Sequence, residues 1–176
     1  MIIEYKALGD GMEFLIFSDS HGKYYGAIEA FERQIQVPDA VFFLGDGVRD
    51  MSASDFGGAA FFSVRGNCDL FAPDSAPAEM TLSFEGHRIL LCHGHFFGVK
   101  SGYGALISHA AELEADIVLF GHTHRPYEVT IPEGFAVGGK ALSRPMYLFN
   151  PGSLGQRSFG TLSLRGDQVL FSHGSL

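Results

Sequence analysis

The chain has 176 residues, of which 46% are hydrophobic and 18% charged, a composition typical of a globular protein rather than a disordered one. Its formal net charge of −8 argues against non-specific binding to nucleic acid, which needs a basic surface. Cys68 and Cys92 are too few for a disulfide framework or a cysteine zinc cage. We find neither a signal peptide nor an apolar run long enough for a membrane helix, and we expect one cytoplasmic domain over residues 1–176.

Short apolar strands alternate with a few helices along the chain. Residues 1–11 are a weak lead-in, either an extra edge strand or a mobile arm. The segment 25–34 predicts a helix, because Ile28, Phe31 and Ile35 recur at helical spacing, and 103–113 predicts a second one. The predicted strands are 12–17, 40–44, 59–64, 78–84, 87–92, 117–120, 127–131, 146–149, 159–164 and 169–172, with 78–92 forming a hairpin.

Polar side chains that can bind metal ions follow five of these strands. The run 117–120 leads into His122 and His124, and imidazole is a common neutral metal ligand. Because ligands of α/β sheets bind at the carboxyl ends of strands, we expect the side chains at the five ends to converge. The predicted ligands are Asp19, His21, Asp46, Asn67, His93, His122 and His124.

This ligand set is too large for one tetrahedral ion and suits two divalent ions that share a carboxylate. We expect manganese first, with iron, zinc or nickel as alternatives, because oxygen and nitrogen donors accept all of them. Bound cations would also let an acidic protein hold a small phosphate ester.

The order of these motifs resembles that of the calcineurin-like metallophosphoesterases. That family carries Asp-x-His, Gly-Asp, Gly-Asn-His-Asp/Glu, a histidine block and Gly-His-x-His. The corresponding blocks here are Asp19-Ser20-His21, Gly45-Asp46, Gly66-Asn67-Cys68-Asp69, His93-Gly94-His95 and Gly121-His122-Thr123-His124. A later Asn150-Pro151-Gly152-Ser153 is typical of the small bacterial and archaeal branch, which includes the scaffold subunit of the eukaryotic retromer.

The resemblance implies a four-layer α/β/β/α sandwich with two mixed β-sheets and a metal-dependent phosphoesterase activity. A hydroxide bridging two ions would attack the phosphorus directly, without a phosphoenzyme. By the same resemblance, Asp19, His21 and His124 hold one ion, Asn67, His93 and His122 hold the other, and Asp46 bridges the two.

One position departs from the family pattern. Cys68 stands where many members have a histidine that helps to protonate the leaving group, and a thiol is a poor acid in that role. His95 is the nearest alternative, Asp69 could orient a neighbouring group, and Asn67 completes the set of candidate catalytic residues. The branch with cysteine here is associated with phosphodiester hydrolysis, which favours a phosphodiesterase.

Two alternative functions are kept. One is a phosphomonoesterase, and the other is a protein-binding scaffold like the retromer relative, with little or no catalysis. The oligomeric state is left open, with a homodimer as one possibility.

Three histidines are expected to be bystanders with no role in the site: His87, placed in a hairpin turn, His109 and His173. The Gly-x4-Gly-Lys match at 134–140 is not a phosphate-binding loop, because Ala141 replaces its Ser or Thr.

Overall fold

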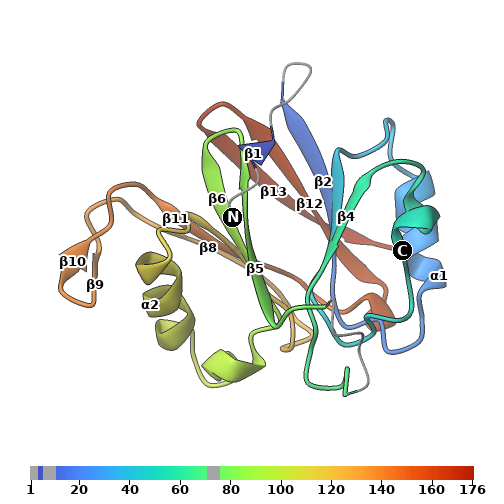
Figure 1. Ribbon diagram of the computed structural model, residues 1–176, viewed down its shortest axis with the longest axis horizontal. Coiled ribbons are helices and arrows are strands. Elements are labelled where there is room, and N and C mark those ends of the chain that lie inside the picture. The colour runs from blue at the N-terminus through green and yellow to red at the C-terminus, as the bar shows by residue number, and fades with distance from the viewer. Residues whose placement is uncertain (1–3, 6–10, 71–75) are drawn as a thin grey trace.

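The computed structural model describes residues 4–5, 11–70 and 76–176, and it contains two mixed β-sheets that pack face to face (Figure 1). Strand β1 (Glu4–Tyr5) agrees with the edge-strand interpretation of the lead-in, whereas residues 6–10 of that lead-in lie outside the described residues. No helix in the described part of the chain is long and apolar enough to span a bilayer.

The first sheet has five strands in the order β13-β12-β2-β3-β4. The pairs β2–β3 and β3–β4 are parallel, and β12 is antiparallel to both β2 and β13. The strands are β2 (Met12–Phe17), β3 (Ala40–Phe43), β4 (Ala60–Ser63), β12 (Ser158–Arg165) and β13 (Gln168–Ser175).

The second sheet has six strands in the order β1-β5-β6-β7-β11-β8. Its remaining strands are β5 (Glu79–Phe84), β6 (His87–Cys92), β7 (Ile117–Leu119), β8 (Pro126–Ile131) and β11 (Met146–Pro151). A separate small hairpin joins β9 (Ala136–Val137) to β10 (Lys140–Ala141), two strands too short to be found from periodicity.

Apolar side chains fill the space between the two sheets and cover both outer faces. Phe14, Phe42 and Phe84 form part of the central cluster, with ring centroids 5.0 to 5.9 Å apart. Burying each such ring stabilises the fold by about 1.5–3 kcal/mol. Helix α1 (Tyr25–Glu32) and the 3₁₀ helix η1 (Ala53–Phe56) pack on the five-stranded sheet, and α2 (Gly104–Glu112) packs on the six-stranded sheet. The predicted four-layer sandwich is therefore confirmed.

The predicted length of the first helix was wrong at its end. Helix α1 stops at Glu32, with Arg33 as its C-cap, so Ile35 does not join the helix face with Phe31 and is fully exposed. The sequence gave no signal for this stop, because neither a glycine nor a proline stands between Glu32 and Pro38.

Candidate metal centre

Six of the seven predicted ligands form two clusters at the carboxyl ends of the strands. Within each cluster one ligand atom from every side chain lies within 4.8 Å of the others. The first cluster contains Asp19, His21 and His124, and the second contains Asp46, His93 and His122. Loops from both sheets contribute, so the sandwich itself brings the two clusters together.

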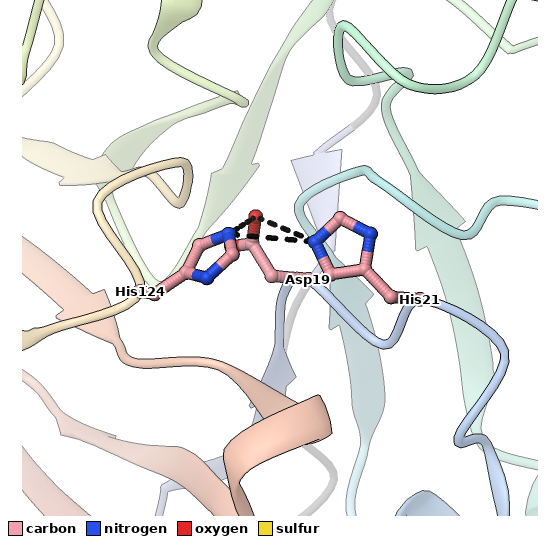
Figure 2. A group of neighbouring side chains, drawn as sticks. All are labelled: Asp19, His21 and His124. Atoms are coloured by element: carbon pink, nitrogen blue, oxygen red, sulfur yellow. Dashed lines mark hydrogen bonds and ion pairs between the residues drawn. The ribbon is translucent and has the colours of Figure 1, made fainter.

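The first cluster is centred on one oxygen of Asp19. His21 and His124 approach its carboxylate from opposite sides, as Figure 2 shows, with their Nε2 atoms 3.9 and 3.1 Å from Asp19 Oδ1. The Nε2 atom of His93 is a third nitrogen, 3.9 Å from the same oxygen. Three imidazoles around one carboxylate oxygen are an arrangement that a shared cation stabilises.

The hydrogen bonding of Asp19 tests whether these residues fit a metal ion. Its side chain is fully buried, and Oδ2 accepts hydrogen bonds from Ser18 Oγ (2.6 Å) and the His122 backbone N–H (3.0 Å). Oδ1, by contrast, is buried without a hydrogen-bond donor. Because a buried polar atom without a partner is costly, this oxygen fits the position of a metal ligand.

The second cluster is oriented by the main chain. His93 is buried, and its Nδ1 lies 2.7 Å from the carbonyl oxygen of Leu44, which can only accept a hydrogen bond. Nδ1 therefore carries the proton, and the lone pair of Nε2 faces Asp46 Oδ2 at 3.4 Å and His122 Nδ1 at 3.2 Å. A carbonyl behind a ligating imidazole commonly fixes its tautomer in metal sites.

Asp46 belongs to the second cluster and also faces the first. Its Oδ2 atom is 3.4 Å from His93 Nε2 in one cluster and 4.0 Å from His21 Nε2 in the other. Burial alone would raise the pKa of Asp46, but the adjacent His93 and the hydrogen bond from the Cys68 backbone N–H outweigh burial and lower that pKa. The carboxylate is therefore charged at neutral pH and has the position of a bridging ligand.

The pKa of His122 is lowered to about 4, because burial, the neighbouring His93 and the Lys100 ammonium all disfavour its protonated form. A neutral imidazole keeps a lone pair for a metal ion.

The backbone of the site is strained. Eight non-glycine residues in the described ranges have positive φ, and five of them are predicted ligands: Asp19, His21, Asp46, His122 and His124. Such conformations cost free energy and cluster at functional sites. Close approach also requires two glycines, since a Cβ on Gly66 would lie 2.1 Å from Asp46 Oδ1 and one on Gly121 would lie 1.8 Å from Ser18 Oγ.

The remaining predicted residues lie around the clusters. Asn67 is exposed, and its amide Nδ2 lies 3.3 Å from the Cys68 sulfur. The Cys68 sulfur itself lies near His21 and Asp46. The pKa of this thiol is raised, mainly by loss of solvation and further by the neighbouring Asp46 carboxylate. The thiol therefore remains neutral.

His95 begins the 3₁₀ helix η2 (His95–Phe97), and its ring centroid is 5.4 Å from that of His93 and 6.1 Å from that of His122. Its Nδ1 atom is buried and has no hydrogen-bond partner.

Asp69 acts on the main chain of the site. Its two carboxylate oxygens accept four backbone N–H bonds, with distances of 2.8 to 3.0 Å, from Asp46, Gly47, Val48 and Gly66. These bonds hold the loop of Asp46 against the loop of Asn67. The geometry gives Asp69 a positioning role and leaves neither of its oxygens unbonded for proton transfer.

Comparisons with known proteins agree with this geometry. Residues 12–164 match the family described as the calcineurin-like phosphoesterase superfamily domain. The probable metallophosphoesterase YsnB of Bacillus subtilis is 31% identical over 143 residues, which cover 81% of this chain and 75% of that protein. The chain belongs to the calcineurin-like phosphoesterase superfamily. Membership indicates a phosphoesterase that depends on divalent metal ions.

Two solved structures show the same superfamily fold. A protein of Streptococcus pneumoniae described as a predicted phosphoesterase has a TM-score of 0.73 at 24% identity, over 96% of this chain and 91% of that one. Vacuolar Protein Sorting 29 from Cryptosporidium parvum has a TM-score of 0.66 at 19% identity, over 96% of this chain and all of that one. At these identities the likeness establishes the fold alone.

Sequence reasoning missed the residues that hold the metallophosphoesterase loops in place. Asn150 Nδ2 donates to the Gly121 carbonyl at 2.8 Å, and Ser153 Oγ donates to the Asp19 carbonyl at 2.9 Å. Asp50 Oδ2 accepts from Ser20 Oγ (2.5 Å) and the Gly22 N–H (2.7 Å), on both sides of His21. The sequence motif at 150–153 could have indicated Asn150 and Ser153, whereas no sequence motif pointed to Asp50.

Proposed function

We propose that the protein is a phosphodiesterase that works with two divalent metal ions, the first held by Asp19, His21 and His124 and the second by Asn67, His93 and His122. The observation that carries the proposal is the position of Asp46, whose carboxylate lies within 4.0 Å of an imidazole from each cluster. One carboxylate can span two ions about 3.5–4 Å apart. Manganese is the proposed metal, with iron, zinc or nickel as alternatives.

When bound, these ions would polarise the phosphoryl oxygens and lower the pKa of water toward neutrality. The protein's own residues prepare the site for them. The Leu44 carbonyl fixes the His93 tautomer, and the hydrogen bonds from Ser18 and His122 fix the Asp19 carboxylate. Preorganised groups of this kind need not rearrange during the reaction.

A small phosphate ester fits the charge around the site. The protein as a whole has a formal charge of −8, but Lys100 and Arg65 lie close enough to His122 and His95 to lower the pKa of these imidazoles. Both cations can attract an anionic substrate. Cys68 in place of the usual histidine supports a diester with a good leaving group, because that thiol stays neutral and is a weak acid.

His95 is the proposed source of a proton for the leaving group. Its ring lies beside that of His93 in the second cluster, and its Nδ1 atom forms no hydrogen bond within the described part of the protein. In this proposal, His95→Gln slows diesters with poor leaving groups by roughly 10²-fold and barely affects nitrophenyl diesters. If His95→Gln instead slowed the hydrolysis of all diesters equally, whatever their leaving group, His95 would position the substrate or the site and would not donate the proton.

The test is hydrolysis of bis-p-nitrophenyl phosphate and p-nitrophenyl phosphate by chelated protein, before and after addition of manganese. We expect manganese-dependent diester cleavage that Asp46→Ala and His122→Ala abolish. His109→Ala is the matched control, since His109 lies on α2 outside both clusters and pairs with Glu79. Faster monoester cleavage would establish a phosphomonoesterase instead. Tight metal binding without turnover of either ester would favour the scaffold function.

A further inference from the structure

One loop of the metal centre exposes a large aromatic ring. Phe96 lies in η2 directly after His95 and is 72% exposed. In the described ranges no other phenylalanine is as exposed, and the next is Phe135 at 52%. Ligand sites are lined preferentially by apolar and aromatic side chains, which a bound molecule covers. An aromatic ring left in solvent beside a metal centre is therefore a candidate contact for the ligand of that centre.

The Phe96 ring is connected to the metal centre through His95. The two ring centroids are 4.0 Å apart, with an interplanar angle of 37°. His95 in turn lies beside the rings of His93 and His122, at centroid distances of 5.4 and 6.1 Å. Along these contacts Phe96 is one ring further from the ligands than His95. A planar group reaches Phe96 from a phosphorus held at the centre when a spacer such as a sugar separates the two.

Two exposed cations act on the same imidazoles. The pKa of His95 is lowered mainly by burial, and the guanidinium of Arg65 lowers it further. The pKa of His122 is also lowered mainly by burial, with a contribution from the Lys100 ammonium. Both positive charges therefore lie within electrostatic reach of the centre. Proteins bind nucleotides by this combination of cations and an aromatic ring, since the phosphate meets the charge and the base stacks on the ring.

We propose that Phe96 stacks on the base of a small nucleotide diester, so that the site prefers esters in which a sugar separates a planar ring from the phosphorus. This inference deepens the phosphodiesterase function proposed above and rests on it. Because every base has a π-face, stacking selects a nucleoside over an alkyl group and does not select one base. The substrate is a small nucleotide, since a formal charge of −8 disfavours a nucleic acid polymer.

The experiment compares two esters on manganese-loaded protein: p-nitrophenyl thymidine 5′-phosphate and methyl p-nitrophenyl phosphate. In both, water attacks the phosphorus, the bond to the nitrophenyl oxygen breaks and nitrophenolate leaves. The esters therefore differ only in the group that stays on the phosphorus. We expect kcat/KM to be about 10-fold or more higher for the thymidine ester, mainly through a lower KM.

Variants of Phe96 separate stacking from simple apolar contact. Phe96→Leu keeps an apolar side chain against His95 and should lower the preference for the thymidine ester about 10-fold. Phe96→Tyr keeps an aromatic ring and should retain the preference. Phe135→Leu is the matched control, because Phe135 is also an exposed phenylalanine but lies between β8 and β9, outside both clusters.

Calorimetric titration with thymidine 5′-phosphate separates this inference from the phosphodiesterase proposal. We expect it to bind manganese-loaded wild type about 10-fold more tightly than methyl phosphate, and Phe96→Leu to remove the difference. If neither ester is hydrolysed, the phosphodiesterase proposal fails and this titration decides the role of Phe96, which equal binding of the two phosphates would overturn. Equal hydrolysis of both esters by the wild type would overturn the role of Phe96 and leave the phosphodiesterase proposal standing. So would a thymidine preference that Phe96→Leu leaves intact.

Discussion

The metal centre and a separate group around Asp116 and His87, called the Asp116 cluster, are both built from buried aspartate and histidine, and they differ in how completely their polar atoms are bonded. In the first, Asp19 Oδ1 is surrounded by imidazole nitrogens yet accepts no hydrogen bond. In the second, Asp116 Oδ1 accepts the Arg88 N–H, and Oδ2 accepts bonds from His87 Nδ1 (2.7 Å) and Arg144 Nη1 (3.0 Å).

The bonding of His87 explains the difference. Its Nδ1 faces Asp116, and its Nε2 lies 3.1 Å from the Gly166 carbonyl oxygen, so both nitrogens meet acceptors and both carry protons. That imidazolium ties β6 to the turn between β12 and β13. The same residue types thus build a structural clamp where every atom is bonded, and a binding site where one oxygen is not.

The largest effect is expected from removing the charge at the unbonded oxygen. Asp19→Asn should reduce kcat/KM by about 10³-fold, because a ligand to one ion is replaced by a neutral amide. Stability of the chelated protein should change by less than about 1 kcal/mol, since the amide oxygen can still accept the His122 N–H. Kinetics and urea unfolding of the same samples measure both. Full activity in this variant would remove Asp19 from the metal site.

Asp116→Ala should have the opposite profile. Removing this carboxylate leaves a buried imidazolium without its partner and costs about 3 kcal/mol of unfolding free energy. Activity per folded molecule should stay at the wild-type level. Asp167→Ala, at an exposed position in the neighbouring turn, is the control. Loss of activity with unchanged stability would contradict the structural assignment of the Asp116 cluster.

A smaller effect is expected at Asp69, which supports the binding cluster without belonging to it. Asp69→Asn keeps one acceptor oxygen and so loses two of the four backbone bonds. We expect metal affinity to fall about 10- to 100-fold, as is common for residues that orient ligands. Activity should recover at saturating metal. A loss of kcat that added metal does not restore would make Asp69 a catalytic residue.

The smallest effect is a pH dependence of the clamp. The hydrogen bond to Asp116 raises the pKa of His87 above its ordinary value, although burial opposes this. The resulting stabilisation is complete below the unfolded pKa of about 6.5 and is lost as pH rises through the folded value. The stability difference between wild type and His87→Gln, measured on chelated protein from pH 5.5 to 9, should shrink with rising pH. A difference that grows would contradict a protonated His87.

The comparison of the two clusters also shows what the sequence could predict. Six of the seven proposed ligands converge as expected, because each follows an apolar strand and the parallel strands end at one edge. Their spacing along the chain carried that information. The α/β class followed from the alternation of strands and helices, and the four-layer sandwich followed from the resemblance to the family. Neither predicted the short hairpin β9–β10 or the early end of α1.

The Asp116 cluster could not be predicted in this way. His87 is the buried first residue of β6, as the predicted strand 87–92 has it, but the expectation that it is a bystander at the hairpin turn was wrong. Its partners Asp116 and Gly166, and the Arg144 that pairs with Asp116, come from three distant segments, each with an ordinary loop sequence. Contacts made by tertiary packing alone leave no pattern in the spacing of residues.

The most direct test of the account is the number of metal ions bound per chain. Chelated protein would be reconstituted with manganese, freed of excess metal and measured by elemental analysis, alongside Asp19→Asn and Asp116→Ala. We expect two ions in the wild type and in Asp116→Ala, and at most one in Asp19→Asn. A wild type that binds no ion or one ion, or an Asp19→Asn variant that binds two, would contradict a two-ion site built on the clusters of Asp19 and Asp46.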